Sequence, residues 1–149
     1  MRSYRFFRLM TLLISVASVG GCGPQSNVAP VTGVIKLGDE PLEFIQVEFW
    51  PDGGQRSFGK TDATGKYELQ TDDRKEVGAT PGVHKVVLKD TWHMQDDYIG
   101  EGGDWVDMSK GRKSRISSKY YDVLKTPLSV TVKPNEANQF DFAADPIGK

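Results

Sequence analysis

Apolar and polar residues alternate with a period of two through most of the chain after residue 30. This alternation is typical of strands that have one buried face and one exposed face. It predicts strands at 31–37, 44–50, 57–61, 66–69, 81–88, 128–132 and 140–142. The predicted inward positions include Val31, Ile35, Ile45, Val47, Phe49, Tyr67, Leu69, His84, Val86, Leu88, Val130 and Val132.

Turn-forming residues separate these predicted strands. Proline and glycine fall between or at the ends of the strands, where a missing backbone N–H is tolerated. Short strands with turn signals at this spacing favour an all-β fold, a seven-stranded antiparallel β-sandwich. No stretch after residue 30 shows helical periodicity that would compete with this prediction.

The N-terminus has a different pattern, typical of a targeting segment. Arg2, Arg5 and Arg8 precede a continuous apolar run at 9–19. A bilayer-spanning helix needs ~20 apolar residues, and this run is shorter. Positive residues followed by a short apolar run are typical of a secretory signal peptide, predicted here at 1–21. The alternative is a buried N-terminal helix. Such a helix would show polar residues recurring at helical spacing, and this run does not.

The single cysteine of the chain follows this segment directly. Val19-Gly20-Gly21-Cys22 resembles the bacterial lipobox, which implies cleavage before Cys22 and acylation of its thiol and its new amine. Residues 22–30 are then a lipidated tether to the membrane, and the protein is expected in the cell envelope, at the periplasmic face or the outer membrane. The alternative is a free thiol that has no role. With one cysteine, no intramolecular disulfide can form.

Three segments resemble a known domain family. VTGVIKLGDEPLEFIQVEFWP, TDATGKYEL and TPGVHKVVL are similar to the carboxypeptidase regulatory-like domain, a transthyretin-like or prealbumin-like sandwich. The resemblance covers 31–143, leaves 144–149 as a tail, and implies the fold while saying little about function. Asp62, Gly65 and Tyr67 occupy its hairpin motif. From their chemistry, Asp62 should bond backbone N–H groups two residues on, and Gly65 should take a positive φ.

The residues do not suggest catalysis. His84 and His93 are the only histidines, too few for a histidine-based zinc cluster, and no nucleophile elbow, P-loop or H-E-x-x-H motif is present. A lone histidine at an inward strand position is more often part of the core. Transthyretin-like hydroxyisourate hydrolases end in a Y-R-G-S motif that this chain lacks. We therefore expect a non-enzymatic protein without a cofactor. A net charge of −1 also argues against a nucleic-acid partner.

One long stretch, 91–118, interrupts the domain between predicted strands. Its acids precede its basic residues, and Trp92, Tyr98 and Trp105 lie among the acids. It could be a flap over the core, a contact site for a glycan or protein partner, or a metal site, although EF-hand spacing is absent. The sequence favours a binding, adhesion or structural accessory module. A carbohydrate-binding module that uses these three aromatic residues is the alternative.

Overall fold

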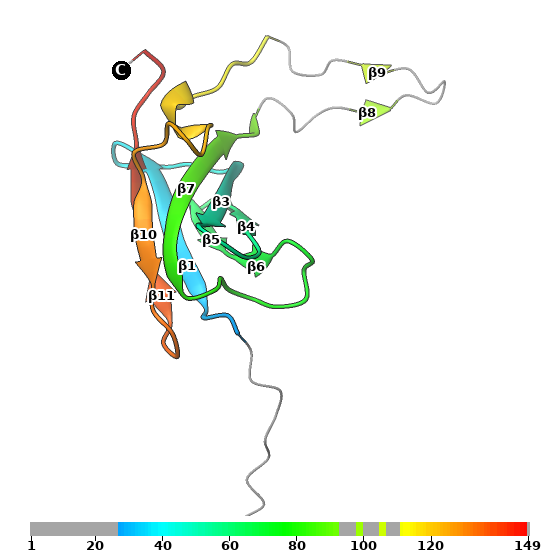
Figure 1. Cartoon of the computed structure of the whole chain (residues 1–149). Helices are drawn as coiled ribbons and strands as arrows, with labels where there is room; N and C mark the ends of the chain where they lie inside the picture. Colours follow the sequence, from blue (N-terminus) through cyan, green and yellow to red (C-terminus); the bar gives the residue numbers. More distant parts are fainter. Residues whose placement is uncertain (1–26, 93–97, 100–104, 107–110, 149) are drawn as a thin grey trace, which may run out of the picture.

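The computed structural model describes residues 27–92, 98–99, 105–106 and 111–148 of the chain. The regular secondary structure of the described part is almost all β, with two five-stranded sheets and a separate two-stranded pair (Figure 1). The prediction of an all-β fold with two sheets is confirmed. The predicted strands overlap β1, β3, β4, β5, β7, β10 and β12, and the structure adds the short strands β2, β6, β8, β9 and β11.

The first sheet is built around β1 (Val31–Leu37). On one edge, β1 pairs antiparallel with β2 (Glu40–Pro41) and β5 (Lys66–Glu68). On its other edge, β1 pairs parallel with β11 (Asn138–Gln139) and β12 (Phe142–Ala144). The prediction of a wholly antiparallel sandwich is wrong at this edge. The turn at 133–137 carries the chain from the second sheet to the first, where it runs in the same direction as β1.

The second sheet is antiparallel throughout, as predicted. Its order is β10 (Ser129–Val132), β7 (Gly82–Asp90), β3 (Ile45–Pro51), β4 (Ser57–Lys60) and β6 (Gln70–Thr71). In its middle, Val47 lies opposite Leu88 on one side and Gly59 on the other. This register places the apolar positions of the central strands on one face, toward the first sheet.

The core lies between the two sheets and follows the predicted alternation. Fully buried side chains come from both sheets and include Val31, Ile35, Ile45, Val47, Phe49, Leu69, Val86 and Leu88. The ring of Phe49 lies near those of His84, Phe140 and Phe142, at centroid distances of 5.7, 5.9 and 6.5 Å. Two buried residues that lie opposite each other depart from the pattern: Glu48 is 1% and Val87 is 2% exposed, although both alternate with the core positions of their strands.

Segments outside the predicted sandwich strands also join the folded domain. Ala29 is buried and pairs with Ala79, so the chain is already part of the fold before β1 begins. A short 3₁₀ helix, Ser118–Tyr120, buries Tyr120, whose hydroxyl donates a hydrogen bond to Asp145 at 2.8 Å. These contacts attach the segment after residue 110 and the C-terminal residues to the same core.

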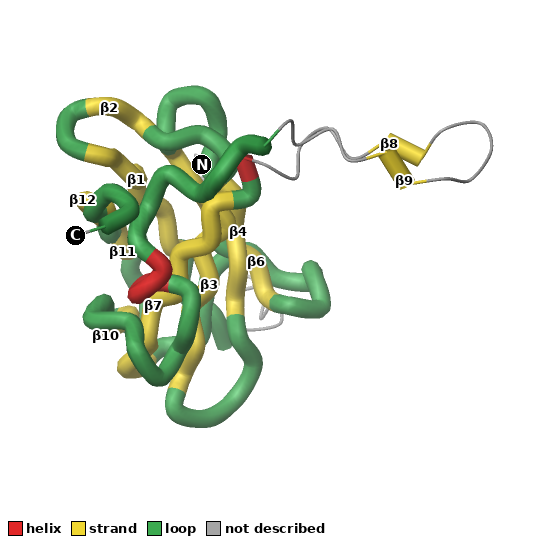
Figure 2. Tube along the Cα trace, turned by 90° about the horizontal axis from the view of Figure 1, so that it is seen from above, coloured by secondary structure: helices red, strands yellow, loops and turns green. Residues whose placement is uncertain are grey.

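Two predicted features fall wholly or partly outside the described residues. Residues 1–26 lie outside them, including Val19, Gly20, Gly21 and Cys22. Within 93–110 the structure describes only β8 (Tyr98–Ile99) and β9 (Trp105–Val106), which pair antiparallel and lie apart from the two sheets (Figure 2). No helix in the described ranges is long and apolar enough to cross a membrane.

Candidate functional site

The stretch 57–71 forms a hairpin whose two arms belong to different sheets. Strand β4 pairs with β3 in the second sheet, whereas β5 pairs with β1 in the first. After Leu69 the chain leaves β1, and β6 pairs with β4. The two sheets therefore meet along this hairpin, and their outer faces form a corner there.

The turn of this hairpin has the geometry expected from its sequence. Asp62 Oδ1 accepts hydrogen bonds from the backbone N–H and hydroxyl of Thr64, at 2.8 and 2.7 Å, and from the N–H of Lys66 at 3.1 Å. The bonds from Thr64 are the main cause that lowers the pKa of the Asp62 carboxyl. Gly65 has a φ of +74°, a conformation that favours glycine. These contacts support a structural role for Asp62 and Gly65.

Two glycines allow the strands to approach closely at the corner. A Cβ on Gly33 would lie 1.8 Å from the carbonyl oxygen of Phe140, and a Cβ on Gly59 would lie 2.3 Å from that of Glu68. Tyr67 fills the space beside Gly33, and its hydroxyl donates a hydrogen bond to Phe140 O at 2.7 Å. Burial raises the pKa of the Tyr67 hydroxyl well above its usual value.

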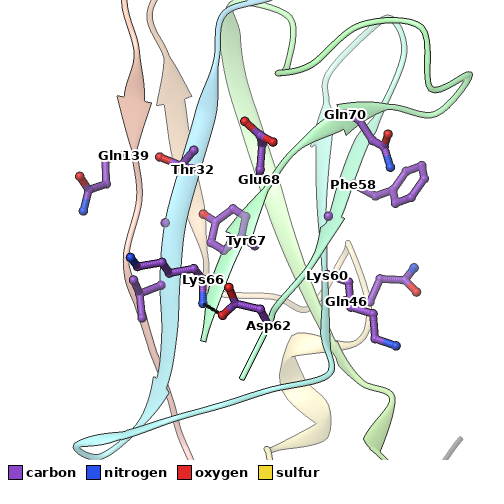
Figure 3. Close-up of a pocket in the computed structure, with 13 residues that line it drawn as sticks. Thr32, Gln46, Phe58, Lys60, Asp62, Lys66, Tyr67, Glu68, Gln70 and Gln139 are labelled. Atoms are coloured by element: carbon purple, nitrogen blue, oxygen red, sulfur yellow. Dashed lines mark hydrogen bonds between the residues drawn. The ribbon is translucent and has the colours of Figure 1, made fainter. Parts of the chain in front are cut away.

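The corner holds an open cleft of about 890 Å³, called the corner cleft below. Figure 3 shows its labelled side chains coming from two sides, with Glu68 and Tyr67 between them. The lining combines polar side chains with apolar surface and consists of Thr32, Gly33, Val34, Gln46, Phe58, Gly59, Lys60, Asp62, Lys66, Tyr67, Glu68, Gln70 and Gln139. A volume of this size lies within the range of small-molecule sites.

The polar groups of the corner cleft fall into two kinds. Gln46 donates a hydrogen bond to Glu48 at 2.6 Å, and the amide of Gln139 donates to Asp141 at 3.2 Å, so these amides are oriented. The side chains of Thr32, Glu68 and Gln70 have no hydrogen-bond partner among the described residues. The cleft thus combines positioned amides with groups that are available to a ligand.

Glu48 anchors a network on the sheet face beside the corner cleft. Its carboxylate accepts hydrogen bonds from Lys89 Nζ at 2.8 Å, Trp50 Nε1 at 2.9 Å and Gln46 Nε2 at 2.6 Å. Arg56 lies 3.8 Å from the same carboxylate, and its guanidinium lies 5.1 Å from the centroid of the Trp50 ring. Burial alone would raise the pKa of Glu48, but these hydrogen bonds lower it below its usual value. The network explains why an acid is tolerated in this buried position.

A second buried carboxylate holds the base of the 91–118 stretch. Asp90 accepts hydrogen bonds from the backbone N–H of Trp92 at 3.0 Å and from Arg115, at 2.7 Å from its N–H and at 2.9 and 2.8 Å from its guanidinium. Burial opposes ionisation of Asp90, but the bonds from Arg115 lower its pKa below the usual value. Arg115 also donates to the carbonyl of Glu43 at 2.6 Å. Asp90, Trp92, Arg112 and Arg115 are called the root cluster below.

The half-buried ring of Trp92 is engaged within the root cluster. The guanidinium carbons of Arg112 and Arg115 lie 4.9 and 5.1 Å from its ring centroid. Phe44 lies 6.0 Å from it, and has a φ of +66° that hydrogen bonds with Thr61 and Thr91 hold in place. These contacts support a structural role for Trp92. The side chains of Tyr98 and Trp105 lie outside what the structure describes.

His84 lies in the core, at an inward position of β7, and is 0% exposed. Its Nε2 is 2.7 Å from the carbonyl oxygen of Thr80. Its Nδ1 has no partner in the described part of the chain, and neither do the hydroxyls of Ser57 and Thr80. His93 lies outside the described residues. Among the described ranges, no group of three or more His, Cys, Asp or Glu side chains could hold a metal ion.

Reasoning from the sequence missed both buried carboxylates and the corner cleft. Glu48 had a weak signal, as an acid between Val47 and Phe49 in a mostly apolar strand. Asp90 and Arg115 are 25 positions apart, and nothing local connects them. The cleft depends on how the two arms of one hairpin divide between sheets, which alternation does not reveal.

Comparison with known proteins adds no assignment. No model of a protein family matches the chain, and no curated protein matches its sequence significantly.

Proposed function

We propose that this protein is a lipid-anchored, non-enzymatic binding module of the cell envelope, built on a transthyretin-like sandwich. The observation that carries the binding role is the corner cleft, where polar side chains from both sheets converge on an open space. A scaffold that holds such side chains on strands is suited to recognising a ligand. The partner is a glycan or another envelope protein.

The N-terminal sequence supports the anchor. Val19-Gly20-Gly21-Cys22 follows the positive and apolar segments in the order of a lipoprotein signal. Each buried CH₂ of an acyl chain contributes ~0.8 kcal/mol, so two or more chains hold a protein firmly on a bilayer. The stretch from Cys22 to Ala29 spans at most about 25 Å when extended. The anchor would therefore keep the sandwich close to the membrane, with the start of β1 on the membrane side and β8 and β9 at the other end (Figure 1).

The transthyretin-like assignment rests on the hairpin motif and the strand pattern. Seven segments make up the two sheets if β5 with β6, and β11 with β12, are each counted as one and the two-residue strand β2 is left out. Asp62 and Gly65 make the local contacts that such a hairpin requires, and Tyr67 bonds to the distant carbonyl of Phe140. Both observations support the proposed seven-stranded fold.

The contacts of His84 and Trp92 favour this function over two others. His84 is enclosed in the core and does not line the corner cleft. A catalytic histidine must reach its substrate, so this position weakens an enzymatic role. The ring of Trp92 already contacts two guanidinium groups, which weakens a carbohydrate site formed by Trp92, Tyr98 and Trp105.

Replacing Cys22 tests the anchor. The Cys22→Ser variant should lose acylation and either leave the membrane fraction or accumulate as the larger, unprocessed chain. The measurements are membrane fractionation, intact mass and labelling with a clickable palmitate analogue. The control is Ser26→Ala in the tether, which should be processed and acylated like the original chain. A Cys22→Ser protein that remains membrane-bound at unchanged mass would refute the proposed anchor.

A further inference from the structure

We propose that the corner cleft binds a neutral, polyhydroxylated oligosaccharide chain. This inference rests on the proposed binding function and names the ligand class and the site. It does not depend on the lipid anchor, because all the residues concerned lie within the sandwich. It also moves the carbohydrate site away from the 91–118 stretch, where the sequence alone suggested it.

The charges of the corner cleft favour a neutral ligand. Its charged lining groups are two cations, Lys60 and Lys66, and two carboxylates, Asp62 and Glu68, so the charges cancel. A neutral ligand can form hydrogen bonds with the polar groups of such a cleft without leaving an unpaired charge in it. A polyanion such as nucleic acid would need an excess of cations, which these lining residues do not supply.

The polar groups are of a kind that matches sugar hydroxyls. Gln46, Gln70 and Gln139 each offer a planar amide with donors and an acceptor, and Glu68 offers a planar carboxylate. Two neighbouring hydroxyls of a sugar ring can bind such a planar group through paired hydrogen bonds. Because the amides lie on strands of both sheets, they can contact a ligand from two sides (Figure 3).

Part of this lining is positioned before a ligand binds. The Nε2 of Gln46 is held by the Glu48 carboxylate, and Gln139 is held by Asp141. The carbonyl oxygen of the Gln46 amide has no partner among the described residues, so it can accept a bond from a ligand hydroxyl. Fixing these groups in advance reduces the ordering cost of binding. The Glu48 network therefore serves the proposed site as well as the sheet.

Phe58 supplies the apolar component that a sugar site needs. Its half-buried ring lies on the outer face of β4, directly opposite Glu48 on β3 and Gln70 on β6. Sugar rings have an apolar face of C–H groups that packs on an aromatic ring. The guanidinium of the exposed Arg74 lies 5.7 Å from the ring centroid, and a flexible side chain of this type can give way to a ligand.

The test measures binding of defined oligosaccharides to the full chain. The protein is purified in a detergent without a sugar headgroup, and titrated by calorimetry with cellohexaose, chitohexaose and maltohexaose. A hexamer of galacturonic acid serves as the acidic probe. We expect at least one neutral hexamer to bind, and to shift the amide NMR signals of β1, β4 and β5. No binding by any neutral hexamer, or binding of the acidic hexamer alone, would overturn the proposal.

Two variants address the site directly. Phe58→Ala removes the ring, and Thr32→Trp places a large side chain at an exposed position of the lining. Each should weaken binding about tenfold or more, which is a difference of about 1.4 kcal/mol. Because Thr32 is exposed, its variant should keep the melting temperature of the original chain, so a loss of binding cannot be attributed to unfolding.

Two further variants are controls. Gln55→Ala replaces an exposed glutamine outside the cleft and should leave affinity unchanged. Trp92→Ala examines the alternative site, and it should also leave affinity unchanged. If Trp92→Ala abolishes binding and Thr32→Trp does not, the corner cleft is not the site. The Cys22→Ser experiment is independent, because an unanchored chain with an intact cleft should still bind the hexamer.

Discussion

The root cluster and the corner cleft use similar residue types in opposite ways. In the root cluster, Asp90 is buried and accepts four hydrogen bonds, and the Trp92 ring contacts two guanidinium groups. In the corner cleft, Glu68 and Gln70 line an open space without a hydrogen-bond partner among the described residues. Both regions contain acids, cations and aromatic rings. The difference is whether these groups are used within the fold.

This contrast separates structural groups from groups available for binding. A buried charge is stable only when the fold supplies its partners, so a satisfied cluster such as the root cluster indicates structure. Polar side chains that converge on a cleft and lack internal partners have capacity left for a ligand. An aromatic residue in an unusual loop, such as Trp92, is therefore weaker grounds for a binding site than its sequence context suggests.

The largest effect is expected from removing the Asp90 carboxylate. Asp90→Ala leaves Arg115 without its main partner in a half-buried position, and should lower the free energy of unfolding by about 3–5 kcal/mol. Urea denaturation measures this. Asp52→Ala removes an exposed acid and should change stability by less than about 0.5 kcal/mol. If the two variants are equally stable, the root cluster does not hold the 91–118 stretch as described.

A smaller loss is expected where the strands of the corner approach most closely. Gly33→Ala places a Cβ against the Phe140 carbonyl and the Tyr67 ring, and should destabilise the fold by about 3 kcal/mol through overpacking. Gly53→Ala is the matched control, because its Cβ would meet nothing within 4 Å. Thermal denaturation should show a clear loss for the first and little change for the second. Equal melting temperatures would contradict the close approach.

Acidification should weaken the structural carboxylates. The pKa values of Glu48 and Asp90 are lower in the folded chain than in the unfolded chain, so the unfolded chain takes up protons first as the pH falls. Their stabilisation is complete above about pH 5 and decreases as the pH falls below about 4.5. Urea midpoints measured from pH 7 to pH 3 should fall in the acid range. A Glu48→Gln variant should show a shallower fall, and an identical profile would argue against the network.

The smallest effect compares two glutamines within the corner cleft. Gln46→Ala removes a hydrogen bond to the buried Glu48 and should cost about 1 kcal/mol. Gln70→Ala removes a side chain without a hydrogen-bond partner among the described residues, and should change stability by less than about 0.5 kcal/mol. Urea denaturation of both variants distinguishes them. If Gln70→Ala lowers the free energy of unfolding as much as Gln46→Ala, the cleft does not contain separate structural and ligand-available glutamines.

Local patterns predicted the strands and the inward positions, because alternation depends only on the period of a strand. They also predicted the turn at Asp62 and Gly65, whose contacts span at most four residues. They did not predict the parallel pairing of β1 with β12. These strands are more than a hundred positions apart in the chain, and no local pattern indicates whether they pair parallel or antiparallel. For the same reason, the pairing of Glu48 with Lys89 and of Asp90 with Arg115 came only from the structure.

The sequence by itself determined the local geometry: which residues face the core, where the chain turns, and the N-terminal pattern that predicts a lipid anchor at Cys22. The tertiary structure decided which polar groups are satisfied. Lys89 reaches Glu48, and Arg115 reaches Asp90, only because the strands and the base of the 91–118 stretch pack together. The corner cleft exists because β4 and β5 pair with different sheets. Pairing between distant strands follows from burial and packing of the whole chain, and no short stretch of sequence contains that information.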